Sequence, residues 1–291
     1  MCELFCLSSR LPTRATFSLD SFASHGAPPG GMIDGWGIAF YDGLDVRLHK
    51  EPEPAGDSIW FAFIKQQRVV SRLIVSHIRR ATMGGISLAN TQPFTREFGG
   101  RMHVFAHNGS LNGIEARYAA AKHRFRPVGE TDSEMAFCML AERLSPLWNA
   151  GAIPTLDQRF DIIALFAAEL RELGPANFLY ADGDALFAHG HRRIQADGTI
   201  APPGLWLLCR ECTVDRDGLP RSGATLGGIE AGVTIEGNGE GQAITLLASV
   251  PLTSEGWRPL AEGEVIVVKE GRVLDRAVDG STEQGDVLAA I

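Results

Sequence analysis

Short apolar stretches recur along the whole chain and are separated by turn-forming residues. Each stretch is rich in Leu, Ile, Val, Phe or Ala, and Gly, Pro, Asn or Asp stand between most of them. Runs of this length and composition are typical of buried or half-buried β-strands. The pattern predicts strands at residues 2–9, 35–41, 72–78, 102–108, 176–182, 185–191, 204–210, 243–249 and 264–273.

Three segments have the pattern of helices. Residues 131–144 begin with the Thr-x-x-Glu spacing of a capping box and continue with good helix formers. Residues 159–173 form an amphipathic pattern that Gly174 and Pro175 bring to an end. A weaker pattern begins at residue 57 or 58 and extends to residue 67, which gives a third expected helix.

The order of these segments indicates the fold class. Asp182 and Gly183 separate two apolar runs, which is a strong hairpin signal, and residues 267–274 contain a second one. Many hairpin strands with clustered helices favour the α+β class, with helices packed on antiparallel sheets. Neither a linker nor an internal repeat interrupts the pattern. We therefore predict one domain over residues 2–291.

The amino-acid composition indicates which binding partners and which cellular compartment suit this protein. The 291 residues are 45% hydrophobic and 21% charged, as in an ordinary globular protein. The net charge of -8 argues against nucleic acid and against a membrane surface as partners. Five cysteines, an odd number without a signal peptide or an apolar run long enough to span a bilayer, predict a cytoplasmic protein.

The second residue is the first candidate for chemistry. If Met1 is removed, the Cys2 thiol lies beside its own α-amine. The unperturbed pKa of such an amine is about 7.7–8.0 and that of a thiol about 8.5, so proton transfer between them suits neutral pH. A terminal amine can act as general base for a nucleophile on the same residue. From position alone, a small residue in an edge strand remains the commoner interpretation.

Two strand ends carry further candidates. Either Arg79 or Arg80 could bind a carboxylate in a bidentate manner, although an ion-paired strand end is the more frequent role. Strand alternation places them on opposite faces, so at most one should line a site. Asn108 and Gly109 could donate hydrogen bonds to an oxyanion, or could simply form a turn. His107 is interpreted as structural.

Two further candidates for a functional role are an aspartate at the start of the helix expected at residues 131–144 and a pair of cysteines. Asp132 in the first helical turn suits the helix dipole and could also bind an α-ammonium group. Cys209 and Cys212 form a single Cys-x-x-Cys without a second pair at zinc-site spacing. A metal or redox role for them is possible in principle, but two unrelated thiols are the simpler interpretation.

The motifs taken in order resemble those of one family. An initial Met-Cys, followed by DGWGIAFY, HIRRAT, NTQPF, AHNGSL and GETDSE, is similar to a class II glutamine amidotransferase of the N-terminal nucleophile hydrolases. The similarity covers about the first half of the chain, and GWRPLAEGEVIVV fits stand-alone members. The resemblance implies a four-layer αββα sandwich of two antiparallel sheets flanked by helices. It implies that no metal or organic cofactor is needed.

The resemblance also implies roles for the candidates. Cys2 would be the nucleophile that forms a thioester with the γ-carbonyl of glutamine, while Asn108 and Gly109 would stabilise the oxyanion. Arg79 would bind the α-carboxylate and Asp132 the α-amine. Larger relatives carry a second domain that consumes the ammonia, and this chain shows only the amidotransferase part. Arg80 and Met83 stand where some of those relatives have an aromatic residue and a histidine.

These implications leave several functions to be distinguished. The chain could release ammonia from L-glutamine for a separate synthase subunit, or could hydrolyse a γ-glutamyl peptide or conjugate. A catalytically silent module would instead sense glutamine through Arg79 and Asp132. A protein that uses Cys209 and Cys212 for metal or redox chemistry is the third class. The matched set of nucleophile, oxyanion donors and substrate-binding groups favours the enzyme.

Overall fold

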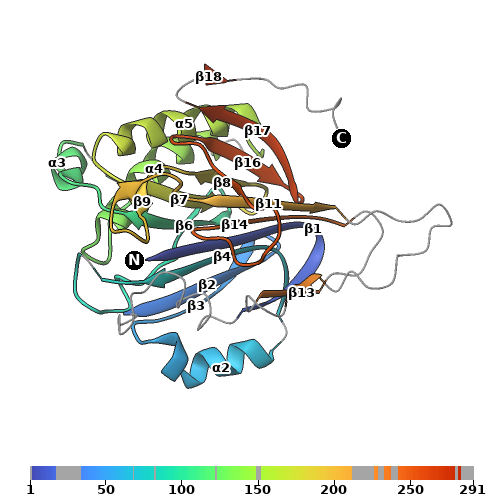
Figure 1. The fold of residues 1–291 in the computed structure, drawn as a ribbon. Coiled ribbons are helices and arrows are strands. Elements are labelled where there is room, and N and C mark those ends of the chain that lie inside the picture. Colours follow the sequence, from blue (N-terminus) through green and yellow to red (C-terminus); the bar gives the residue numbers. More distant parts are fainter. Residues whose placement is uncertain are drawn as a thin grey trace.

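The computed structural model describes residues 2–17, 34–67, 69–81, 83–121, 123–148, 152–211, 226–228, 233–236, 242–278 and 281–282. Within these residues, the strands form two large antiparallel sheets that lie face to face (Figure 1). Helices cover the outer face of each sheet.

The first sheet is built around the N-terminal strand. In spatial order its main strands are β15 (Arg258–Pro259), β11 (Trp206–Glu211), β14 (Ala243–Ala248), β1 (Glu3–Phe17), β4 (Val70–Arg79), β2 (Gly35–Asp42) and β3 (Asp45–Glu51). The short strands β12 (Leu226–Gly228) and β13 (Val233–Glu236) extend it beside the end of β1. Because β14 and β4 both pair with the start of β1, the residues next to Cys2 are held from both sides.

The second sheet runs β18 (Ser281–Thr282), β17 (Arg272–Val278), β16 (Val265–Lys269), β8 (Leu186–His189), β7 (Ala176–Ala181), β6 (Arg101–Gly109) and β5 (Phe94–Phe98). A separate ribbon pairs β9 (Arg193–Ile194) with β10 (Ile200–Ala201). The predicted hairpins are confirmed: β7 pairs with β8, and β16 pairs with β17.

The helices complete a four-layer arrangement. Below the first sheet in Figure 1 lies α2 (Ile59–Gln66), preceded by the 3-10 turn η1 (Ala55–Asp57). Above the second sheet lie α4 (Asp132–Trp148) and α5 (Leu156–Arg171), and the short helix α3 (Ile114–Ala119) lies beside them. The αββα sandwich that the sequence analysis expected is therefore confirmed.

Strand alternation distributes the core among these layers. On β1, Leu4 and Cys6 belong to the cluster between the two sheets, whereas Phe5 and Leu7 face the layer that contains α2. A separate cluster packs α4 and α5 on the second sheet. Because successive strand residues point to opposite faces, a strand that is buried on both sides must be apolar throughout. This explains why the first part of β1, Leu4–Leu7, is a continuous apolar run rather than an alternating one.

The helix boundaries differ in part from the predictions. Helix α5 begins three residues earlier than expected, because Thr155 and Gln158 form a capping box there. At α4 the predicted capping box is only half formed: the Glu134 N–H donates to Thr131 Oγ1 at 3.2 Å. The Glu134 carboxylate does not return to Thr131. It accepts instead from the Gly129 N–H at 2.7 Å and pairs with Arg96.

Among the residues that the structure describes, no helix combines the length and the apolar character needed to cross a membrane.

A buried ion-pair network at the β7–β8 turn yields a prediction about stability. Arg159 pairs with Asp182 at 2.7 Å and with Asp184 at 2.9 Å, and the side chains of Arg159 and Asp182 are at most 1% exposed. Replacing Asp182 with alanine should lower the free energy of unfolding by about 3–5 kcal/mol, because the buried Arg159 guanidinium loses the more deeply buried of its two carboxylate partners. Urea unfolding measures this change.

The matched control for that variant is an exposed pair. Arg47 and Asp42 are similarly close, 2.6 Å apart, but both side chains are 62% exposed. Asp42→Ala should change the free energy of unfolding by less than about 1 kcal/mol, because exposed ion pairs contribute little. Equal losses in the two variants would contradict the assignment of the Arg159 network as a structural anchor.

Candidate active site

Cys2 lies directly before β1, and its sulfur forms hydrogen bonds with the backbone of Arg80, the residue that follows β4. Its Sγ accepts a hydrogen bond from the Arg80 N–H at 3.2 Å, and the thiol donates to the Arg80 carbonyl at 3.3 Å. The side chain is half-buried. Arg80 therefore contributes its backbone to the surroundings of Cys2, which sequence reasoning on its side chain could not reveal.

Residues directly after Cys2 are fixed by a buried network. Leu4 and Ser249 exchange two hydrogen bonds, each 3.0 Å long, between the Leu4 backbone and the N–H and hydroxyl of Ser249. Glu3 forms a buried ion pair with Arg193 at 2.7 Å, and Arg193 also donates to the Ser249 carbonyl. Few protein N-termini are tied down in this way, and this anchoring gives the Cys2 sulfur a defined position.

Burial controls the ionisation of this thiol. It raises the pKa of Cys2 above the ordinary value for a thiol, and the hydrogen bond from the Arg80 backbone opposes that shift. The thiol form therefore predominates near neutral pH. Since the thiolate is the nucleophilic form of cysteine, catalysis by Cys2 would require a base that removes its proton.

Arg79 ends β4, and its side chain is buried. Its Nη2 donates to the carbonyls of Met83 at 3.0 Å and Gly84 at 3.2 Å. Its Nη1 is buried and has no hydrogen-bond partner among the described residues. A buried guanidinium nitrogen without a partner is costly, and an anion such as a carboxylate would satisfy it. The neighbouring Arg80 side chain is half-exposed.

Asn108 and Gly109 end β6 in the second sheet, and the side chain of Asn108 reaches Cys2. The Asn108 side-chain amide donates to the backbone carbonyl of Cys2 at 2.7 Å. The side chain of Asn177 in turn donates to the Asn108 carbonyl at 3.0 Å. At Gly109, a Cβ atom would lie 1.8 Å from the Pro175 carbonyl oxygen, so only glycine fits there. The Asn-Gly pair is thus the end of a paired strand rather than an isolated turn.

Asp132 is the first residue of α4, and its carboxylate lies near the same strand end. One oxygen accepts from the Leu111 N–H at 2.8 Å, and the other accepts from the Ser133 N–H at 2.8 Å. Ser133 Oγ also lies 2.8 Å from Nδ1 of the buried His107. The pKa of His107 is lowered by burial, and the neighbouring Asp132 carboxylate only partly opposes this shift. Among the described hydrogen bonds, the His107 ring contacts Ser133, and none joins it to Cys2.

Gln92 is a contributor that the sequence analysis did not identify. Its side-chain amide forms two hydrogen bonds to the backbone of His107, one from the N–H at 2.7 Å and one to the carbonyl at 3.1 Å. The Gln92 side chain thus pairs with the backbone N–H and carbonyl of His107, as the backbone of a neighbouring strand would. The glutamine of the NTQPF motif therefore supports the strand end that carries Asn108.

The other candidates lie away from this cluster. Cys209 is exposed on β11, where its sulfur lies 3.6 Å from Thr245 Oγ1. Cys212, the other cysteine of the Cys-x-x-Cys, lies outside the described residues, as does Met1.

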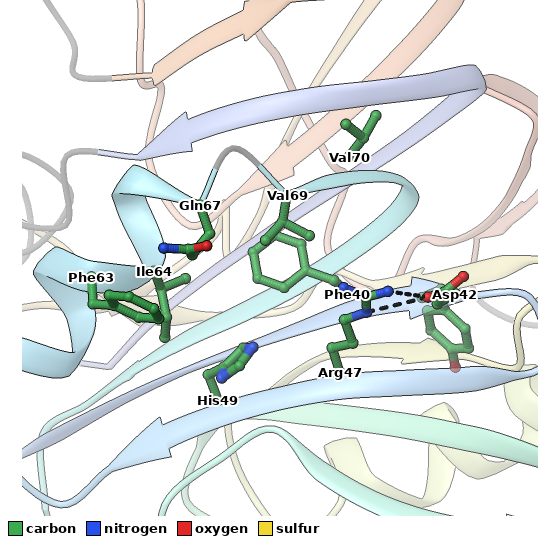
Figure 2. Close-up of a pocket in the computed structure, with 10 residues that line it drawn as sticks. Phe40, Asp42, Arg47, His49, Phe63, Ile64, Gln67, Val69 and Val70 are labelled. Atoms are coloured by element: carbon green, nitrogen blue, oxygen red, sulfur yellow. Dashed lines mark hydrogen bonds and ion pairs between the residues drawn. The ribbon is translucent and has the colours of Figure 1, made fainter.

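A groove of about 490 Å³ lies on the outer face of the first sheet (Figure 2). Figure 2 shows the Arg47–Asp42 pair on one side of it, with Phe63 and Ile64 of α2 on the other. It adjoins the end of β2 opposite to Gly35, the residue that pairs with Arg79. This groove is therefore distinct from the candidate active site.

Comparison with known proteins assigns the chain to a family. The family described as "Glutamine amidotransferases class-II" matches residues 1–287. The chain therefore belongs to the class II glutamine amidotransferases. It is 34% identical over 273 residues to the Escherichia coli K12 protein named "Putative glutamine amidotransferase YafJ", a match that covers 91% of this chain and 96% of that protein.

Solved structures agree with this assignment. A predicted glutamine amidotransferase from Pseudomonas aeruginosa PA01 is 29% identical with a TM-score of 0.62, over 94% of this chain and 99% of that one. A glutamine phosphoribosylpyrophosphate amidotransferase from B. subtilis shares the fold, with 14% identity and a TM-score of 0.58. That match covers 96% of this chain and 50% of the larger protein.

Proposed function

We propose that this chain hydrolyses the γ-amide of L-glutamine to glutamate and ammonia, with Cys2 as the nucleophile and residues 2–291 acting as one catalytic domain. The observation that carries the proposal is the 2.7 Å hydrogen bond from the Asn108 amide to the Cys2 backbone. It brings an Asn-Gly strand end to the one half-buried thiol at the start of the chain. Membership of the class II glutamine amidotransferases supports the same reaction.

In the proposed mechanism, the Cys2 sulfur attacks the γ-carbonyl carbon and its proton passes to a base. The α-amine of Cys2, exposed once Met1 is removed, is the proposed base. The Asn108 amide and the Gly109 N–H donate to the oxyanion that forms. The protonated amine then gives its proton to the departing ammonia. Water attacks the resulting thioester, which releases glutamate and restores the thiol.

The other two residues are proposed to bind the amino-acid end of the substrate. The unpartnered Nη1 of Arg79 is suited to the α-carboxylate. The Asp132 carboxylate is suited to the α-ammonium group, because Oδ2 accepts from one described donor, the Leu111 N–H, and retains acceptor capacity. Oδ1 accepts from both the N–H and the hydroxyl of Ser133. Together they would select an L-α-amino acid whose α-carboxylate and α-ammonium groups are both free, whatever group is attached to the γ-carbonyl.

The experiment that tests this function compares two substrates. Glutamate release is measured from L-glutamine and from a γ-glutamyl dipeptide, on protein whose mass confirms the loss of Met1. We expect release from L-glutamine. Faster release from the dipeptide would instead identify a hydrolase of γ-glutamyl peptides or conjugates. A marked increase on addition of a synthase would identify the chain as an ammonia-supplying subunit.

The raised pKa of Cys2 leads to a prediction about its reactivity. Alkylation of Cys2 by iodoacetamide should continue to accelerate above pH 9, because burial keeps the thiol protonated at lower pH. Mass spectrometry of the N-terminal peptide separates Cys2 from the exposed Cys209. A rate that levels off below pH 8 would show that the thiolate is already formed in the free enzyme and would contradict the need for a base.

A further inference from the structure

The side chain of Asn90 connects two loops that are far apart in sequence. Its Nδ2 donates to the Gly85 carbonyl at 3.0 Å, and its Oδ1 accepts from the Glu130 N–H at 2.8 Å. The side chain is buried, with 2% of its surface exposed. A single buried amide thus satisfies one backbone group from each loop.

Both loops pack directly against this amide. A Cβ atom on Gly84 would lie 2.8 Å from Asn90 Nδ2, and one on Gly129 would lie 2.3 Å from Asn90 Oδ1. Gly84 also has a φ of 71°, a conformation that favours glycine. Glycine at these two positions allows the backbone of each loop to approach Asn90 more closely than any other residue would.

Each loop adjoins one of the two groups proposed to bind the substrate: the first follows Arg79 at the end of β4, and the second leads into Asp132 at the start of α4. On the first loop, the Met83 and Gly84 carbonyls accept from Arg79 Nη2 and so orient that guanidinium. On the second loop, Glu130 lies two residues before Asp132, where α4 begins. Asn90 therefore connects the loop that supports the Arg79 guanidinium to the loop that leads into Asp132.

We propose that Asn90 is a positioning residue that fixes the separation of Arg79 and Asp132, so that the α-carboxylate and the α-ammonium group of one amino acid bind at the same time. This inference rests on the proposed function. It deepens that function, because it explains how two loops from different parts of the chain recognise both ends of an L-α-amino acid. Asn90 itself need not touch the substrate.

A purely structural role would have different consequences. An amide that only stabilised the fold would affect ligands with one or two charged groups to the same extent. A residue that sets a separation affects only ligands that use both groups at once. L-Glutamate and glutarate make this comparison possible, because glutarate keeps both carboxylates and lacks the α-ammonium group.

The test measures how these ligands protect Cys2 from iodoacetamide, which requires no turnover. The variants are Asn90→Asp, which keeps the acceptor for Glu130 and loses the donor to Gly85, and Asn90→Ala, which loses both. Thr91→Val is the matched control. Thr91 is also buried, and its hydroxyl donates at 2.9 Å to the carbonyl of Ser87 within its own loop.

For both Asn90 variants we expect the L-glutamate concentration that gives half-protection to rise roughly tenfold to a hundredfold, the range that follows from losing one buried hydrogen bond. Half-protection by glutarate, and the alkylation rate without ligand, should stay close to those of the unmodified chain. Thr91→Val should preserve the preference for L-glutamate over glutarate. The KM for L-glutamine should rise more than kcat falls in the Asn90 variants.

Three results would overturn the inference. An unchanged L-glutamate preference in folded Asn90 variants would show that Asn90 does not set the separation. An equal weakening of both ligands, together with a lower melting temperature, would assign Asn90 a structural role alone. Absence of protection by L-glutamate in the unmodified chain would instead refute the proposed function, and with it this inference.

Discussion

Replacing Cys2 with alanine should abolish glutamate release, with a loss in kcat of at least about 10⁴-fold, while L-glutamate continues to bind. Removal of a catalytic nucleophile in a covalent mechanism has effects of this size. Arg79 is held by the Met83 and Gly84 carbonyls, and Asp132 is held by the Leu111 and Ser133 N–H groups. None of these bonds involves the Cys2 sulfur. Glutamate release measures turnover, and calorimetry with L-glutamate measures binding.

Cys6→Ala provides the matched control on the same strand. Cys6 is fully buried in the cluster between the two sheets, and burial raises its pKa far above its ordinary value. Its removal should lower the melting temperature and leave kcat of the folded protein unchanged. If Cys2→Ala retained turnover, another nucleophile would be responsible. If the unmodified chain bound L-glutamine without turnover, it would be the silent sensor considered in the sequence analysis.

Most of the central strands could be predicted because both of their faces are buried. β1, β4, β6 and β14 are flanked by strands on both sides and lie between packed layers, so their apolar runs stand out in the sequence. The edge strands β3 and β5 were missed for the same physical reason. Each has a strand partner on one side only among the described residues, and polar side chains such as Arg47 and Arg96 are tolerated there.

The candidate site was predictable only in its separate motifs. Cys2, Arg79, Asn108 and Asp132 belong to four different elements, and no local pattern states that these elements meet. The side chains that join them were not predicted at all. Gln92, for example, bonds the backbone of His107 from 15 residues away in the chain, and such a contact leaves no periodic signal.

The half-formed capping box illustrates how tertiary contacts override a local motif. Thr131 and Glu134 have the expected spacing, and the Thr131 hydroxyl does cap the helix. The Glu134 carboxylate is nevertheless drawn to Arg96 on β5, where a charged hydrogen bond replaces the weaker one to the helix start. The position of Asp132 therefore depends on a strand that the sequence analysis did not predict.

Removing the Asn108 amide is expected to give the second-largest loss of activity. In Asn108→Ala, kcat should fall about 10²- to 10³-fold, the cost observed when one oxyanion donor is lost. KM should change little, because the amide would interact with charge that develops only after attack. The same substitution removes the 2.7 Å hydrogen bond to the Cys2 backbone, so the alkylation rate of Cys2 must be measured beside turnover.

A comparison of two variants separates these two contributions of Asn108. Asn108→Asp keeps the size of the side chain but presents only acceptor oxygens to the oxyanion and to the Cys2 carbonyl. It should be at least as impaired in kcat as Asn108→Ala, and Asn177 should still support its backbone. If KM rose in both variants while kcat stayed constant, Asn108 would bind the substrate ground state. The oxyanion donors would then have to be sought elsewhere, beginning with the Gly109 N–H.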